Sequence, residues 1–245
     1  AAEIDNPKGL SLNSGNAFKG YDLLGMGFTF DDSKTDGTTS SLAVMEDIKA
    51  KYPEQAIRIF PYIGGEEINS SPVHAFHRYA INLSDLTYDE CRSGFPNLLE
   101  IVDNKVLPGR KKLADTERMK RLKQNYWTYN EARPKLTQKL SQMECVLACS
   151  QVSPHLAVAR MDAKILFANY CIVFTYSSCS ALAVLQSRIH EIWARFFSSS
   201  MKDDLRYAPS DCFETFPFPK DFESNDMLEH VGQAYHDHRA TLMID

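Results

Sequence analysis

The sequence predicts an α+β fold: a mixed, mostly antiparallel β-sheet with long basic helices and an appended C-terminal helical part. Two observations support this class. Short apolar or alternating segments typical of strands come first, and helical periodicity is concentrated later in the chain. The 245 residues have an ordinary apolar and charged content, which is enough for one large domain or two small ones with a real core.

The first part of the chain is predicted to contain strands and one helix. Residues 23–30 are an apolar, glycine-punctuated strand, and residues 39–52 are a helix that ends before Pro53. Residues 57–63 form the next strand. Residues 77–83 form another, because their side chains alternate as those of a half-buried strand do.

A cationic segment follows. Residues 105–139 contain eleven Lys or Arg and three acids, so this segment carries +8 and the rest of the chain −13, although the formal net charge is only −5. Two helical pieces are expected, 111–130 and 134–143, with Pro134 at the first helical position, where its missing N–H costs nothing. Such segregated charge favours a polyanionic partner, and a solvated helix surface is the alternative.

The last third of the chain begins with short strands and ends in helices. The strands are expected at 145–149, 157–159, 165–168 and 171–176. An amphipathic helix follows, with one apolar face formed by Leu182, Leu185, Ile189, Ile192 and Phe196. Arg188, Glu191 and Arg195 share another face of it. An extended strap that ends in FPFP and a polar helix at 225–241 complete the chain.

These elements predict two parts. Residues 1–180 are a β-rich unit that includes the basic helical segment 108–143, and residues 181–245 hold the helix, the strap and the C-terminal helix packed on it. No apolar run approaches the roughly 20 residues of a membrane helix. The six scattered cysteines lack a CxxC pair or zinc spacing, which favours a reducing cytoplasm.

The sequence shows few signs of catalysis. It has neither a glycine-rich turn that would hold S-adenosylmethionine nor a proline-rich loop for a flipped base, and the serine-hydrolase and zinc-protease motifs are missing. His74 and His77 are three apart but lie in a predicted loop, where that spacing does not align them on a metal. We therefore expect no catalytic residue, no metal site and no cofactor in this chain.

Several motifs resemble one family in the right order. The stretch LQSRIHEIWARF followed by LRYAPSDCFETFPFP, with PYIGGEEIN at 61–69, RYAIN at 78–82 and RPKL at 133–136, is similar to the C-terminal target-recognition region of Eco57I-like and Type IIG–IIL restriction–modification DNA adenine methyltransferases. In that family Trp stands where this chain has Tyr79. The resemblance implies a parent protein that methylates the exocyclic amine of adenine with S-adenosylmethionine, through a separate upstream domain.

The resemblance implies double-stranded DNA as a partner, with two kinds of contact. We expect base readout from the loop before the 157–159 strand and from Arg160, just after that strand. Gln151 suits adenine, and His155 or Arg160 suits guanine; Ser153 lies beside them in the loop. A plain hairpin turn is the alternative. The phosphate contacts expected are Lys19, Lys111, Lys112, Arg118, Lys120, Arg121, Lys123, Arg133, Arg188 and Arg195.

Two other functions remain open at this stage. The chain could be a protein-interaction or specificity subunit that docks to a separate methyltransferase chain through its helices and the FPFP strap. A stand-alone small-molecule enzyme would need a convergent polar pocket, which the sequence does not indicate. For Trp127, Trp193, Phe213, Phe216 and Phe218, packing in the core is the expected role rather than stacking on bases.

Overall fold

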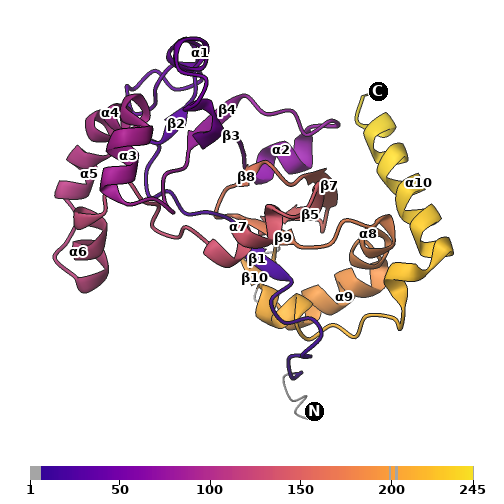
Figure 1. Ribbon diagram of the computed structural model, residues 1–245. Helices are drawn as coiled ribbons and strands as arrows, with labels where there is room; N and C mark the ends of the chain where they lie inside the picture. The colour runs from indigo at the N-terminus through magenta and orange to yellow at the C-terminus, as the bar shows by residue number, and fades with distance from the viewer. Residues whose placement is uncertain (1–6, 199, 202–203, 245) are drawn as a thin grey trace. The chain divides into compact units, whose positions relative to one another are not determined.

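The computed structural model describes residues 7–198, 200–201 and 204–244, and the chain divides into two compact units (Figure 1). Unit 1 consists of the segment that ends at Gly20, Gly64–Ala75 and the segment from Lys135 onward. Unit 2 consists of Tyr21–Ile63 and Phe76–Pro134. Both units are therefore assembled from pieces that are separated in the sequence.

A four-stranded sheet forms the centre of unit 1. Its strands lie in the order β1 (Ala17–Lys19), β9 (Cys171–Phe174), β5 (Cys145–Ser150) and β7 (Val158–Asp162), and each neighbouring pair is antiparallel. Every residue of β9 is buried, as expected of a strand covered on both faces. The short strands β10 (Ser200–Met201), β11 (Asp204–Arg206) and β6 (Val152–Ser153) pair antiparallel in a second sheet.

Helices of unit 1 pack around this core. The core cluster joins the sheet residues Leu147, Ile172 and Phe174 to Leu182 and Phe213. The helices are α2 (Gly65–Ser70), α7 (Pro134–Leu140, which starts at the unit boundary), α8 (Cys179–Leu185), α9 (Arg188–Phe197) and α10 (Asp226–Leu242). A π-helix at Pro209–Phe213, a 3-10 turn at Phe222–Ser224 and the short strand β8 (Leu166–Phe167) complete it.

Helix α10 lies against α8, at a contact that only glycine permits (Figure 1). A Cβ on Gly232 would sit 1.8 Å from the Cys179 carbonyl oxygen. We therefore expect Gly232→Ala to force the helices apart and to lower the free energy of unfolding by about 1–3 kcal/mol, measured by urea denaturation. Gly109→Ala is the control, because a Cβ there meets nothing within 4 Å; it should be neutral or slightly stabilising. Equal effects would contradict the close packing.

Unit 2 combines antiparallel strands with short helices. Strand β4 (Arg78–Ile81) pairs with β2 (Thr29–Phe30) and with β3 (Ile59–Ile63). The helices are α1 (Leu42–Lys51), a 3-10 turn at Ala56–Arg58, α3 (Tyr88–Gly94), α4 (Pro96–Lys105), α5 (Leu107–Lys111) and α6 (Glu117–Gln124). These strands and helices, with those of unit 1, confirm the α+β class with antiparallel pairing.

The basic segment differs from the two long helices that the sequence predicts. It forms the short helices α5, α6 and α7 instead. Thr116 caps the start of α6, because its side chain accepts from the Met119 N–H, and the helix ends at Gln124. Beyond it the chain turns inward, because Trp127 and Tyr129 are buried and Trp127 Nε1 donates to the Leu86 carbonyl at 2.9 Å. Core packing of Trp127 thus ends the helix, as expected for packing rather than base stacking.

The predicted amphipathic helix is broken in two. Helix α8 ends at Leu185, and Ser187 caps the start of α9 by accepting from the His190 N–H. The break changes which face of α9 is buried: His190 and Ala194 face the core. The prediction that Ile189, Ile192 and Phe196 continue the apolar face of Leu182 and Leu185 was wrong, since these three side chains are 73, 55 and 60% exposed.

The boundaries of the two observed units differ from the predicted boundary at residue 180. Residues 181–245 belong to the same unit as residues 135–180, and residues 108–133 of the basic segment belong to unit 2. The chain passes from one unit to the other four times, so no single division of the sequence separates the two units. The division at residue 180 stays a prediction.

Candidate nucleic-acid interface

The predicted readout loop lies between β5 and β7 of unit 1; we call residues 151–157 the β5–β7 loop. The backbone fixes its first half. The Gln151 N–H donates to the Tyr170 carbonyl at 2.7 Å, and the Gln151 carbonyl accepts from the Tyr207 N–H at 2.8 Å. Val152 and Ser153 pair with Arg206 and Leu205 of β11. This half of the loop is therefore part of a small sheet rather than a free turn.

Side chains from α8 and α9 hold the second half. The Arg195 guanidinium donates to the Pro154 carbonyl at 2.5 Å. The Gln186 amide makes two bonds: it donates to the Leu156 carbonyl at 2.9 Å and accepts from the Val158 N–H at 2.8 Å. Leu156 itself is buried in the core cluster. Between these anchors Pro154 and His155 are exposed, so the loop presents two adjacent residues on a fixed backbone.

The four predicted readout residues differ in exposure. His155 is exposed, and Ser153 is half-buried, with its hydroxyl accepting from the His155 N–H and from Asn69 Nδ2, each at 3.4 Å. Gln151 is only 5% exposed, so little of its side chain can reach a base edge. Arg160 is half-buried, and its Nε donates to the Ser177 carbonyl at 3.0 Å. The structure thus gives His155 the most accessible side chain of the four.

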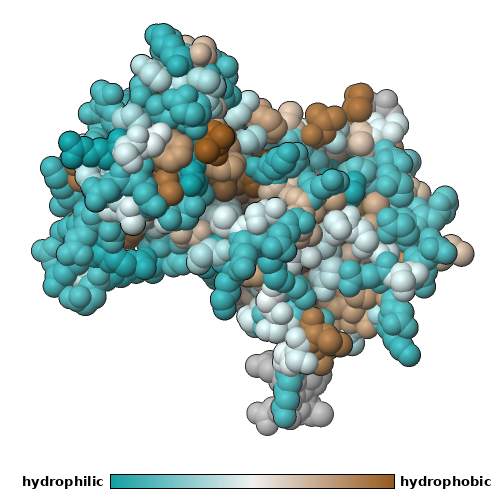
Figure 2. All heavy atoms as spheres, in the orientation of Figure 1, coloured by the Kyte–Doolittle hydropathy of each residue, from teal (hydrophilic) through white to brown (hydrophobic). Residues whose placement is uncertain are grey.

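The predicted phosphate contacts in unit 2 fall into two groups. Four are ion-paired with neighbouring acids: Lys120 with Glu117, Lys123 with Asp115, and both Arg118 and Arg133 with Glu131. For Lys111, Lys112 and Arg121, which are exposed, no acidic partner is found among the residues that the structure describes. Figure 2 shows hydrophilic side chains covering α5 and α6. The unpaired three carry most of the uncompensated positive charge of these helices.

The predicted phosphate contacts in unit 1 are mostly engaged as well. Arg188 and Arg195 of α9 both pair with Glu191, at 2.7 and 3.0 Å. Burial raises the pKa of Glu191, but the hydrogen bonds from the two arginines outweigh it and leave that pKa below its ordinary value. Lys19 lies on the edge strand β1, half-buried, opposite Ile172. The two arginines therefore form one network with a shared carboxylate rather than two free cations.

A buried histidine connects α9 to the β5–β7 loop. His190 Nδ1 lies 2.8 Å from the Leu185 carbonyl, and its Nε2 lies 3.0 Å from the Tyr207 hydroxyl. Burial lowers the pKa of His190 to about 4, so the ring is neutral near pH 7. A neutral ring donates from Nδ1 to the carbonyl and accepts from Tyr207 at Nε2. Tyr207 in turn donates its N–H to the Gln151 carbonyl, at the base of the loop.

Sequence reasoning missed the roles of Gln186 and His190. Both lie in the LQSRIH motif, where the helical periodicity suggested an uninterrupted helix. The available signal was Ser187, a residue type favoured at helix N-caps, two positions after the last apolar residue of α8. A break at that point makes Gln186 a helix-terminal residue, and its amide is then free to bind a neighbouring loop.

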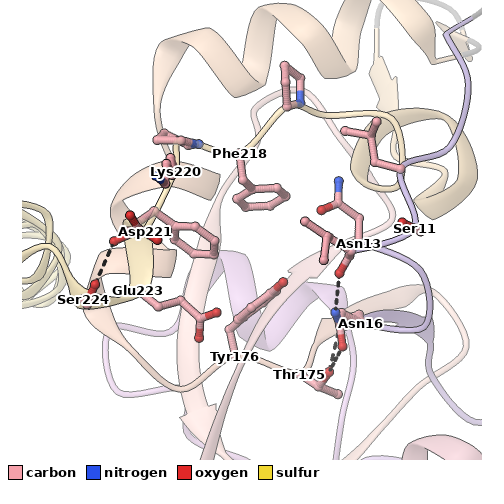
Figure 3. A pocket seen from close by; sticks show the side chains of 15 residues that line it. Ser11, Asn13, Asn16, Thr175, Tyr176, Phe218, Lys220, Asp221, Glu223 and Ser224 are labelled. Atoms are coloured by element: carbon pink, nitrogen blue, oxygen red, sulfur yellow. Dashed lines mark hydrogen bonds between the residues drawn. The ribbon is translucent and has the colours of Figure 1, made fainter.

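The FPFP strap lines a hollow of about 980 Å³ in unit 1 (Figure 3). Figure 3 shows the rings of Phe218 and Tyr176 on its wall, with Asn13 and Asn16 beside them. The Asn13 amide donates to the carbonyls of Phe213 and Phe216, at 3.0 and 2.8 Å. The Asn13 side chain thus fixes the strap in place. Phe213 and Phe216 are buried, and Trp193 and Phe218 are half-buried, as expected for packing residues.

Among the residues that the structure describes, no group of three or more His, Cys, Asp or Glu side chains is placed to hold a metal ion. His74, which the sequence raised as a metal ligand, lies near Arg239 of α10, with His74 Nε2 3.4 Å from an Arg239 nitrogen. Within the same residues no helix has the length and apolarity to cross a membrane.

Comparison with known proteins gives the family. A family model described as "MmeI, target recognition domain" matches residues 28–220. DNA methyltransferase A of Bacillus subtilis (strain 168) is 22% identical over 186 residues, which are 75% of this chain and 20% of that protein. A structure of the Type IIL restriction–modification enzyme MmeI in complex with DNA matches with a TM-score of 0.62 and 16% identity, over 96% of this chain and 27% of that one.

The structural match shows a shared fold, and the family model gives the class, a target recognition domain. Because that model spans most of the chain, the chain belongs to the MmeI target recognition domain family. This confirms the resemblance that the sequence motifs indicate. The chain spans about a fifth of the length of the Bacillus subtilis protein and about a quarter of the MmeI chain.

Proposed function

We propose that this chain is the target-recognition region of a restriction–modification DNA methyltransferase. It binds double-stranded DNA and selects the site at which the catalytic domain of the same parent protein methylates the exocyclic amine of adenine. The methyl group comes from S-adenosylmethionine bound by that catalytic domain. Such a protein acts in the bacterial cytoplasm, which suits a chain whose six cysteines are all free.

The observation that supports this function best is the geometry of the β5–β7 loop. Base discrimination needs side chains held in fixed positions on an element that can enter a groove. Pro154 and His155 are exposed on a backbone that is fixed on both sides by hydrogen bonds. His155 carries a ring nitrogen that can donate to the acceptor edge of guanine, and the exposed cations of α5 and α6 supply attraction to phosphates without specifying bases.

The direct test is selection from a randomised duplex library with the parent protein, followed by sequencing of the bound DNA. Recovery of a shared motif that coincides with the methylated adenine supports the proposal. Recovery of unselected sequences at low salt, with no shared motif, would reject sequence recognition and leave only electrostatic binding.

The exposed cations give a separate prediction. Lys112→Ala or Arg121→Ala should weaken binding to all duplexes by a similar factor and reduce the slope of log K against log salt by about 1, as loss of one phosphate contact does. Titrations by fluorescence anisotropy at several salt concentrations measure both quantities. Lys34→Ala is the control, since Lys34 is exposed and carries the same charge outside the basic segment. An effect of Lys34→Ala as large as that of Lys112→Ala would show net charge alone to be responsible.

A second function is favoured by one observation, the exposed apolar residues Ile189, Ile192 and Phe196 on α9. In the specificity-subunit alternative, this face docks to a separate methyltransferase chain. A pull-down of the catalytic chain by this chain, lost on Ile192→Asp, would support it. Duplex selection by this chain in the absence of any other chain favours the target-recognition function instead.

A further inference from the structure

The two side chains that hold the second half of the β5–β7 loop both bind main-chain atoms. Arg195 reaches the Pro154 carbonyl, and Gln186 binds the Leu156 carbonyl and the Val158 N–H. These three atoms lie on either side of His155. The contacts therefore fix the backbone that carries the exposed ring, whatever side chain stands at that position.

The Arg195 guanidinium donates hydrogen bonds to two acceptors within the protein. Its Nε pairs with Glu191 at 3.0 Å, and its Nη2 donates to Pro154. The Glu191 carboxylate also accepts from Arg188 and has only 19% of its side chain exposed. Because Arg195 already donates to the Glu191 carboxylate and to the Pro154 carbonyl, its guanidinium is poorly placed to contact a phosphate. The sequence suggests that phosphate role. Arg188, with 73% of its side chain exposed, binds Glu191 and, within the part of the chain that the structure describes, does not hydrogen-bond to the loop.

Gln186 makes its two bonds because the helix ends there. It is the C-cap residue of α8, and the next residue, Ser187, is the N-cap of α9. Its amide offers one acceptor and two donors, so it satisfies a carbonyl and an N–H that are two residues apart, as a neighbouring strand would. Both loop groups lie near the buried core, where an unpaired polar group is costly.

We infer that Gln186 and Arg195 are positioning residues for base choice: they hold the β5–β7 loop from the α8–α9 junction and set where His155 meets the DNA. This inference rests on the proposed function of the same loop. Neither side chain touches DNA in this role. Their loss should reduce discrimination between cognate and altered sites while leaving the electrostatic part of binding unchanged.

The experiment uses the parent protein with Gln186→Ala, Gln186→Glu, Arg195→Ala and, as the matched control, Arg188→Ala. Affinity is measured for the cognate duplex and for duplexes with one altered base pair, each at several salt concentrations, and thermal unfolding is recorded for each variant. The Gln186→Glu variant retains the acceptor for the Val158 N–H and places a carboxylate against the Leu156 carbonyl, which repels it. It thus tests the loop without removing side-chain volume.

The expected result is a loss of discrimination on the order of tenfold for the Gln186 and Arg195 variants, with unchanged affinity for unrelated DNA and an unchanged salt slope. Arg188→Ala should leave the discrimination unchanged, because in the described part of the chain Arg188 makes no contact that holds the loop. If Arg195→Ala weakens all duplexes equally and reduces the salt slope by about 1, Arg195 is a phosphate contact and the inference is overturned. Unchanged discrimination in Gln186→Glu overturns it as well. If the unaltered protein itself shows no discrimination, the proposed function fails instead.

Discussion

Replacement of His155 by alanine in the parent protein is expected to change which DNA sites are methylated. His155 is exposed at the tip of a loop whose backbone is fixed by Ser153, Arg195 and Gln186. One mismatched base pair in a recognised site typically costs about 1–3 kcal/mol, and a side chain held in this way can supply part of that discrimination. Its loss should therefore allow methylation at sites that differ at that position, with rates within about tenfold of the cognate rate. Sequencing of methylated adenines in DNA treated with the variant measures this.

Gln151→Ala provides a comparison within the same loop. The sequence suggests that Gln151 reads adenine, yet its side chain is only 5% exposed. We expect a smaller change in site choice than for His155→Ala. If both variants methylate the same sites as the unaltered protein, the loop does not read bases. If Gln151→Ala alone changes the sites, the buried amide reaches DNA only after a rearrangement of the loop.

The stability of the chain should fall as the pH is lowered from 6.5 toward 4, because of His190. Burial holds the pKa of His190 at about 4 in the folded state, against 6.5 for an ordinary histidine. Between these values the unfolded chain binds a proton that the folded chain excludes, so protonation favours unfolding. The free energy of unfolding should decrease by up to about 3 kcal/mol across this window and should not depend on His190 above pH 6.5. Urea denaturation at pH 7, 5.5 and 4.5 measures the change.

His190→Asn is the variant that isolates this effect. Asparagine can donate to the Leu185 carbonyl but does not titrate, so the variant should be less stable at pH 7 and should lose the part of the pH dependence that His190 contributes. Burial also lowers the pKa of His74 to about 4, which contributes in the same direction. The matched His74→Asn variant measures that share. An unchanged pH dependence in both variants would contradict the assigned protonation states.

Element types could be predicted from the sequence more readily than their limits. Alternating and apolar patterns located β3, β4, β5 and β9, because a strand with buried faces needs such residues. The break between α8 and α9 was missed, since Leu185, Ile189 and Ile192 keep helical spacing across it. Spacing records which residues could share a face, whereas the cap at Ser187 and the burial of His190 decide which of them do.

The positive charge of the basic segment could be predicted from the sequence, but the acidic residues that pair with each Lys or Arg could not. Glu131 neutralises Arg118 and Arg133 from beyond the end of α6, a contact that depends on how the chain turns after Gln124. The candidate loop could likewise be located between two strands from its sequence. Its anchors could not, because Gln186 and Arg195 approach it from residues some 30 to 40 positions away.

The way in which the β5–β7 loop is anchored has an evolutionary consequence. Arg195 and Gln186 form hydrogen bonds to main-chain N–H and C=O groups of the loop. These bonds do not involve the side chain at position 155. If His155 meets a base pair as proposed, a codon change there would alter the chemical groups offered to that base pair, while the supporting contacts stay intact. Under the proposed role of this loop, a domain of this design could acquire a new target sequence in a single mutational step without first losing its fold.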